Sequence, residues 1–215
     1  IKETHPKSGR KPLPINRLFH AYLEQIKFTP FILVTLAVST NFAVLFSFIS
    51  SSPFIYIKIY HLSLDLFGYF FAINAVALII GSVFSNRLKE RFSDRSIIFG
   101  AISTTIIGAL LMLAFVELNP YSMLSVVIPS FIVTYGVGVL FPVLMSYALR
   151  HVVSYIGLTS SLTGTSRFTF AAGVGFLMGF LISSSAVPLA VVMLCLSLMT
   201  ALFMLFYFNH FKTKL

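Results

Sequence analysis

Charged residues and cysteine are scarce in this sequence. Charged side chains make up 10% of its 215 residues, whereas an ordinary soluble domain has about 25%. Hydrophobic residues make up 58%, more apolar surface than a water-soluble globule can bury. The single cysteine, Cys195, excludes a disulfide within the chain, and its apolar surroundings predict an inert packing residue. The composition therefore predicts a membrane protein.

Carboxylates and imidazoles are absent from the interiors of the apolar runs. The six acidic residues and five histidines lie in loops or at the ends of the runs: Glu3, Glu24, Asp65, Glu90, Asp94, Glu117, His5, His20, His61, His151 and His210. Proton-coupled transport usually needs such a group inside the membrane, so another segment would have to supply it. The sequence also lacks an HExxH motif, a paired intramembrane Asp and a metal-ligand cluster. We therefore expect no enzyme, no metal and no cofactor.

Six apolar runs are long enough to cross a bilayer, which takes about 20 residues. They cover residues 31–52, 66–84, 97–116, 123–148, 156–182 and 187–208. Pro53, the charged segment 86–95 and Asn119 with Pro120 mark three of the ends. We expect an all-α membrane protein with a cytoplasmic linker at residues 1–29 and a bundle of six transmembrane helices at residues 30–215.

The basic residues indicate the orientation of these helices. Of the fifteen Lys and Arg residues, Lys58 lies in a segment on one side, Arg167 lies within a run, and the others lie on the opposite side. Positive charge near a span resists translocation, so we expect both termini in the cytoplasm. The net charge of +9 is thus explained by membrane orientation and not by nucleic-acid binding.

The linker contains apolar residues at helical spacing. These are Ile15, Leu18, Phe19, Tyr22 and Ile26. The pattern predicts an amphipathic helix. It has two interpretations, a helix lying on the cytoplasmic leaflet or a soluble linker helix between two membrane halves.

Three polar residues within the runs are candidates for function. Arg167 stands roughly 17 Å from the cytoplasmic end of its run at 1.5 Å per residue. A cation at that depth costs at least about 2.5 kcal/mol, so it should face protein or a water-filled cavity. The alternative is a structural Arg that binds helix carbonyls. Asn41 and Asn74 have two interpretations as well, as cavity-lining residues or as bridges between helices.

The fourth and fifth runs are rich in small residues. Gly136, Gly138 and Pro142 predict an interrupted helix, and interrupted helices in transporters adjoin binding sites. Tyr135 and Phe141 flank the expected break. The fifth run has a small-residue face on which another helix can pack, formed by Ala171, Ala172, Gly173, Gly175 and Gly179.

Several stretches together resemble one family. They are ET followed by KSGRKPL, then FSFISSSPFIYI, GYFFAINAVALIIGS and GLTSSLTGTSRFTFAAGVG. The sequence resembles, over nearly its whole length, the bicyclomycin-resistance (Bcr/CflA) branch of drug:proton antiporters in the major facilitator superfamily. The stretch GSVFSNRLKERFSDRSIIFG resembles the superfamily's basic cytoplasmic loop.

The resemblance implies a twelve-helix exporter of the bacterial inner membrane that confers antibiotic resistance by drug efflux. Two six-helix bundles, each a 3+3 inverted repeat, would alternate the access of a central cavity. This sequence resembles the carboxy-terminal bundle, so the implied partners are an amino-terminal half, lipid, protons and a small apolar or amphipathic drug-like substrate. The alternative is a non-transporting membrane subunit or an inactive remnant of an interrupted transporter gene.

The resemblance also implies roles for particular residues. Arg167 occupies the place of the Arg in the family's SLxGTxRF motif. The cavity candidates are Asn41, Phe46, Asn74, Tyr135, Phe141, Arg167 and Phe170. In the cytoplasmic loop, Arg87, Arg91, Asp94 and Arg95 would hold one conformational state through ion pairs that break when the bundles move.

Overall fold

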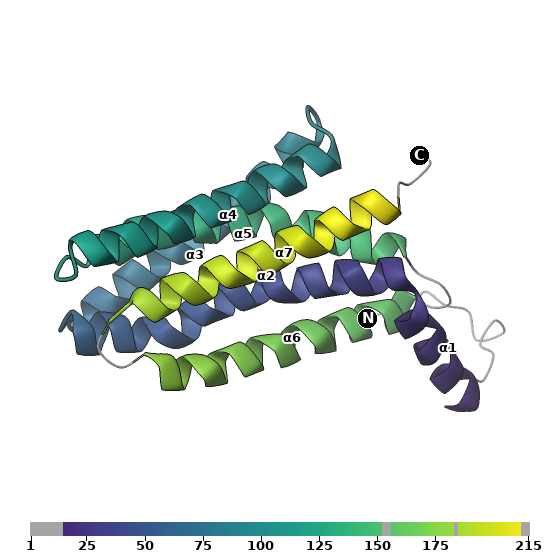
Figure 1. Cartoon of the computed structure of the whole chain (residues 1–215), viewed down its shortest axis with the longest axis horizontal. Coiled ribbons are helices and arrows are strands. Elements are labelled where there is room, and N and C mark those ends of the chain that lie inside the picture. The colour runs from purple at the N-terminus through teal and green to yellow at the C-terminus, as the bar shows by residue number, and fades with distance from the viewer. Residues whose placement is uncertain (1–14, 152–155, 183–184, 212–215) are drawn as a thin grey trace, which may run out of the picture.

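The computed structural model describes residues 15–151, 156–182 and 185–211, and every regular element in these ranges is a helix. The helices are α1 (Ile15–Lys27), α2 (Thr29–Pro53), the π-helix η2 (Phe54–Ile59), α3 (Leu64–Lys89), α4 (Asp94–Leu118), α5 (Leu124–Arg150), α6 (Ile156–Leu181) and α7 (Val187–His210). Helices α2 to α7 form an elongated bundle, and α1 crosses one end of it (Figure 1). The predicted all-α class is confirmed.

Five of these helical stretches are long and apolar enough to cross a membrane. They are α2 together with η2, α3, α4, α5 and α7. Helix α6 has 26 residues, but its first half is rich in Ser, Thr and Gly and contains Arg167, which lowers its hydropathy. Five predicted spans are therefore confirmed by length and composition, and the sixth stays a prediction.

Pro53 does not end the first span, so that prediction was wrong. The chain continues as η2, in which the Tyr60 amide donates a hydrogen bond to the Ile55 carbonyl at 3.1 Å. Pro53 itself has helical backbone angles, with φ −62° and ψ −39°. A proline removes one hydrogen-bond donor, and the wider π-helical turn lets the helix proceed beyond it. Lys58 consequently lies in a helix and not in a loop.

Helix α5 is continuous, which corrects the predicted interruption of the fourth span. Its glycines serve close packing instead. A Cβ added to Gly138 would lie 2.5 Å from the carbonyl oxygen of Leu78 in α3. A Cβ on Gly136 would lie 3.1 Å from the carbonyl oxygen of Ala101 in α4. The small residues therefore bring three helices close together without breaking α5.

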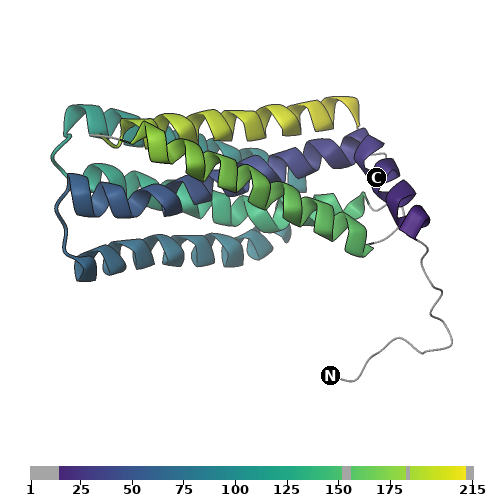
Figure 2. The ribbon, with the colours of Figure 1, turned by 90° about the horizontal axis from the view of Figure 1, so that it is seen from below.

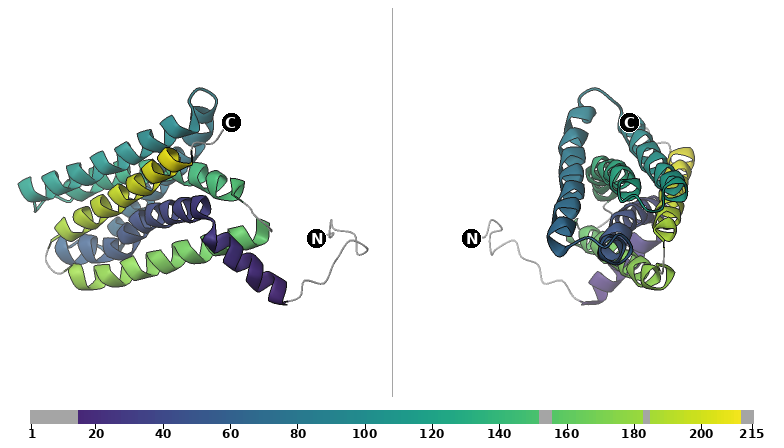
Figure 3. Two further views of the ribbon diagram at one scale, coloured as in Figure 1. Left: turned by 45° about the vertical axis from the view of Figure 1, so that its right-hand side comes forward. Right: turned by 90° about the vertical axis from the view of Figure 1, so that its left-hand side faces the viewer.

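The helices pack in a regular pattern. Helix α2 packs against α6 and α7, while α5 packs against α3 and α4. The two groups meet where α2 contacts α5 and where α4 contacts α7. The view along the bundle places α3 and α6 at its periphery (Figure 3). Both peripheral helices carry exposed apolar side chains: Tyr69, Ile73, Val76, Ile79, Ile80 and Val83 on α3, and Phe168, Phe176, Leu177 and Phe180 on α6.

Helix α1 is attached to the bundle by polar contacts. The side-chain amide of Gln25 donates a hydrogen bond to the His151 carbonyl at 2.7 Å, and the hydroxyls of Tyr22 and Ser161 lie 3.1 Å apart. Figure 2 shows α1 lying across the end of the bundle. Phe19 and Ile26 of the predicted apolar face are exposed. The side chains of residues 15–18 lie outside the described part of the chain.

Candidate functional site

The guanidinium of Arg167 lies among three phenylalanine rings. Its Cζ is 5.3 Å from the ring centroid of Phe42 in α2, 5.4 Å from that of Phe141 in α5, and 4.8 Å from that of Phe168 in α6. The Nε atom is buried and has no hydrogen-bond acceptor among the described residues. Aromatic faces stabilise a partly desolvated cation. We call these four residues the Arg167 cage.

The seam between α2 and α6 holds the cage in place. The hydroxyls of Ser39 in α2 and Ser166 in α6 lie 3.0 Å apart. Ser166 immediately precedes Arg167 in the sequence. Farther along the same seam, a Cβ on Gly175 would lie 2.9 Å from Cε1 of Phe46. The Phe46 ring stacks on Phe42, with centroids 6.4 Å apart. The serine pair and the glycine together fix how closely α2 and α6 approach.

An apolar hollow adjoins the cage. It has a volume of about 280 Å³ and is lined by Phe42, Leu45, Leu78, Ile79, Ser82, Val137, Gly138 and Phe141. Phe42 and Phe141 therefore belong to both the cage and the hollow. Ile79 is 61% exposed and Phe168 is 54% exposed, so the site opens at the surface of the bundle between α3 and α6. An apolar hollow beside one cation is suited to a small amphiphilic ligand.

The two embedded amides differ in their contacts. Asn74 bridges two helices, since its Nδ2 donates to the Phe70 carbonyl and its Oδ1 accepts from Thr134 of α5, both at 3.2 Å. It also borders a small hollow of about 120 Å³. Asn41 is buried, and its Nδ2 has no hydrogen-bond partner in the described ranges. Of the two amides, Asn41 is therefore the one whose side-chain N–H donors are available to a ligand.

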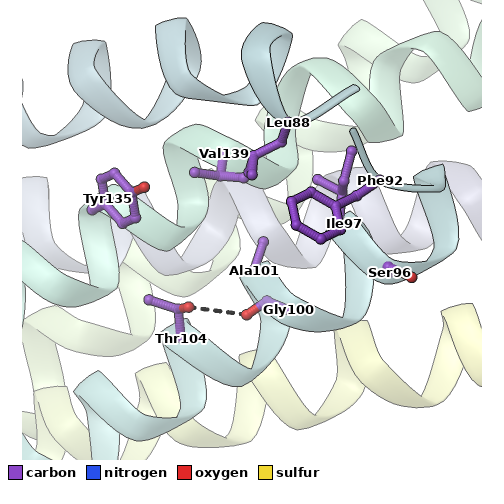
Figure 4. A pocket seen from close by; sticks show the side chains of 9 residues that line it. All are labelled: Leu88, Phe92, Ser96, Ile97, Gly100, Ala101, Thr104, Tyr135 and Val139. Carbon is purple, nitrogen blue, oxygen red and sulfur yellow. Dashed lines mark hydrogen bonds between the residues drawn. The ribbon is translucent and has the colours of Figure 1, made fainter. Parts of the chain in front are cut away.

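Two other cavity candidates lie apart from the cage. Tyr135 lines a separate hollow of about 330 Å³ between α3, α4 and α5, and Figure 4 shows its ring at one side of that hollow. The bond drawn there, from the Thr104 hydroxyl to the Gly100 carbonyl at 2.9 Å, is internal to α4. Phe170 packs against the buried apolar cluster that contains Val44 and Phe48. The structure thus groups Arg167 with Phe141 and, through Phe42, with Phe46.

The predicted cytoplasmic loop between α3 and α4 has one ion pair in the described part of the chain. A guanidinium nitrogen of Arg150, at the end of α5, lies 3.0 Å from Oδ2 of Asp94 at the start of α4. Arg87, Arg91 and Arg95 make no ion pair there, and Arg95 lies over two aromatic rings instead. Sequence reasoning missed Arg150 because the pair joins residues 56 positions apart. The ion pair joins two helices and not two residues of one turn.

His151 follows α5 directly and lies near α1 and α7. Its Nε2 is 2.7 Å from the Tyr207 hydroxyl, and its ring meets the Phe28 ring edge-on at 5.8 Å. Burial, and secondly the charge of Arg150, lower the pKa of this imidazole below its ordinary value. The neutral form is therefore favoured in the folded chain.

Acidification should consequently destabilise the chain. Between the ordinary histidine pKa of about 6.5 and the lower pKa of the folded state, the unfolded chain binds a proton that folded His151 does not. We expect the melting temperature in detergent to fall as the pH drops from about 7.5 to about 5.5. The fall should be smaller for His151→Asn. An identical pH dependence in the two proteins would refute this role of His151.

The bundle and the cage define a class of protein. Five apolar helices of spanning length, with a half-buried cation beside an apolar hollow, are the features of a polytopic membrane protein. The sequence model of the Major Facilitator Superfamily matches residues 2–176. The chain belongs to the major facilitator superfamily of membrane transporters.

Two curated relatives agree with this membership. The chain is 30% identical over 205 residues to a "Bicyclomycin resistance protein homolog" of Haemophilus influenzae. It is 26% identical over 193 residues to an "Uncharacterized MFS-type transporter YdgK" of Bacillus subtilis. Each match covers 90% of this chain and 48% of the relative. The chain therefore spans about half the length of the curated relatives it matches.

Proposed function

We propose that this chain forms the carboxy-terminal half of a secondary active drug exporter and acts together with an amino-terminal six-helix half. The observation that carries the proposal is the Arg167 cage beside an open apolar hollow. A cation at this depth in a membrane bundle marks a substrate or ion pathway. The Haemophilus influenzae relative, named for bicyclomycin resistance, supports export of bicyclomycin or similar amphiphilic drugs.

Helix α6 is the sixth span in this proposal. Its 26 residues extend over about 39 Å, and it packs along α2 within the bundle (Figure 1). The packing pattern also supports a 3+3 repeat. In such a repeat α2 corresponds to α5, α3 to α6, and α4 to α7. The observed contacts of α2 with α6 and α7 then correspond to the observed contacts of α5 with α3 and α4.

The exposed sides of α3 and α6 support a partner half. Only 17% of the most apolar stretch of α3 is buried, against 67% for α5. Lipid alone can cover apolar side chains, but α6 also exposes Thr165 and Thr169 next to the half-buried Arg167. Polar and ionised groups at membrane depth are stable against protein or water. A second bundle facing α3 and α6 across a water-filled cavity provides both.

The proposed substrate site is the cage with its hollow, together with Phe46 and Asn41. Tyr135 is left out because it lines a different hollow. Proton coupling is assigned to the partner half, since all acidic residues of the described spans lie at helix ends. The Asp94–Arg150 pair is proposed to stabilise one state of the cytoplasmic side and to break in the other.

In this proposal the chain lies in a bacterial inner membrane, and both of its termini are in the cytoplasm. In a Cys195→Ser background, a membrane-impermeant maleimide should label Asn119→Cys in intact cells, because the end of α4 faces outward. Glu90→Cys, at the end of α3, should react only after permeabilisation. Labelling of Glu90→Cys in intact cells would reverse the orientation.

The function is tested by drug accumulation in cells. A susceptible bacterium that expresses this chain with an amino-terminal half should accumulate less bicyclomycin than cells expressing either half alone. A protonophore should restore accumulation. If the two halves assemble in the membrane and accumulation stays at the level of the single halves, the chain is a non-transporting subunit or remnant.

A further inference from the structure

The cage limits how a ligand can reach Arg167. The ring centroids of Phe42, Phe141 and Phe168 lie 4.8 to 5.4 Å from the guanidinium carbon, so aromatic rings crowd the group. A guanidinium donates hydrogen bonds only in its own plane and accepts none. It makes no hydrogen bond in the described part of the chain, and Nε is buried without an acceptor. The cage thus holds a cation whose donors are unused.

The surroundings do not neutralise this cation. Arg167 is the one ionised group of the cage, and the residues that line the hollow are apolar except for Ser82. Arg167 lies near the middle of α6, whereas the acidic residues of the described helices lie at helix ends. These acidic residues are Glu24, Asp65, Glu90, Asp94 and Glu117. In a site of low dielectric, an unpaired positive charge strongly favours anions and repels cations.

We infer that the Arg167 cage selects the charge of the substrate, an inference that rests on the proposed export function and specifies it further. The ligand is an amphiphile that carries an acceptor oxygen, such as a carbonyl, carboxylate or sulfonate, beside a cyclic apolar group. The oxygen accepts from the Arg167 donors, while the cyclic group fills the hollow of about 280 Å³ and contacts Phe42 and Phe141. Neutral and anionic compounds bind, and lipophilic cations do not.

Two fluorescent probes with the same ring system test this selectivity. They are 1-anilinonaphthalene-8-sulfonate, which is anionic, and N-phenyl-1-naphthylamine, which lacks the sulfonate. The chain contains no Trp, so protein fluorescence interferes little. Binding is measured to the full 215-residue chain in phosphatidylcholine nanodiscs, after subtraction of empty nanodiscs. In Arg167→Gln the dissociation constant of the sulfonate should rise about tenfold or more, as expected for a lost hydrogen bond to a charged group.

The neutral probe separates recognition from a structural role. Its dissociation constant should change by less than about threefold in Arg167→Gln, because its ring contacts remain. Phe42→Leu should weaken the binding of both probes, since Phe42 lines the hollow. The matched control Lys89→Gln removes a charge from the exposed end of α3 and should leave both affinities unchanged.

Three results would overturn the inference. The first is an equal rise in the dissociation constants of both probes in Arg167→Gln. The second is the absence of saturable binding of the sulfonate to the wild-type chain. The third is binding of a naphthyl probe with a quaternary ammonium as tight as that of the sulfonate. These measurements are made at equilibrium, without a gradient or a partner half. Failure of export with charge-selective binding intact therefore refutes the proposed function alone, and unselective binding with intact export refutes only the charge selection.

Discussion

Arg167→Ala should reduce drug efflux by the assembled transporter to background, a loss of at least about tenfold. The variant removes the donors proposed to bind the substrate and leaves three phenylalanine rings without the cation they surround. Membrane insertion should be unaffected or improved, because a central arginine costs at least about 2.5 kcal/mol to insert. Efflux is measured in inverted membrane vesicles that contain equal amounts of the two proteins.

A conservative variant distinguishes recognition from charge alone. Arg167→Lys keeps a positive charge but loses the planar donors and the guanidinium contacts with the rings of Phe42 and Phe141. We expect partial efflux from it, between the values of the wild type and Arg167→Ala. Wild-type efflux rates in Arg167→Ala would remove Arg167 from the substrate pathway and would favour a purely structural arginine.

Gly81→Ala should destabilise the bundle markedly. A Cβ on Gly81 would lie 2.3 Å from the carbonyl oxygen of Tyr135 and 3.0 Å from the amide nitrogen of Val139. Both atoms belong to the α5 backbone, so no side chain can rotate away and the two helices must separate. Overpacking of this kind costs about 1 to 3 kcal/mol. We expect a lower melting temperature and a lower yield of monodisperse protein in detergent.

The matched control is on the same helix. A Cβ on Gly68 would meet nothing within 4 Å, and alanine is favoured over glycine in a helix by up to about 1 kcal/mol. Gly68→Ala should therefore leave the melting temperature unchanged or raise it. Equal melting temperatures for Gly81→Ala and Gly68→Ala would contradict the close approach of α3 and α5.

Much of the fold was predictable because a bilayer imposes a simple length rule on apolar helices. Asn119 and Pro120 were expected to end the third span, and α4 indeed ends at Leu118. Proline was less informative. Pro53 was expected to end the first span, but the span continues beyond it as η2, while Pro142 lies within a continuous α5. Whether a helix continues past a proline depends on the backbone hydrogen bonds around it, and composition does not reveal those bonds.

The site was predictable only in part. Arg167 was singled out by its depth, and the structure places the ring of Phe141, another predicted cavity residue, beside it. Phe42 and Phe168 were missed because the rotation of each helix about its axis determines which of the 24 Phe residues faces the cation. Two local signals were available, the adjacency of Phe168 to Arg167 and the four-residue spacing of Phe42 and Phe46 on one helical face. The Asp94–Arg150 pair gave no such signal, since it depends on how α4 and α5 align.

Transport by reconstituted protein tests the central claim most directly, namely that this chain is one half of an exporter. Proteoliposomes containing this chain, the amino-terminal half, or both are given an imposed pH gradient, and the transport of radiolabelled bicyclomycin is followed. The proposal predicts gradient-dependent transport only when both halves are present, and its loss when Arg167→Ala replaces the wild-type chain. Transport by the amino-terminal half alone at the rate of the pair would contradict it.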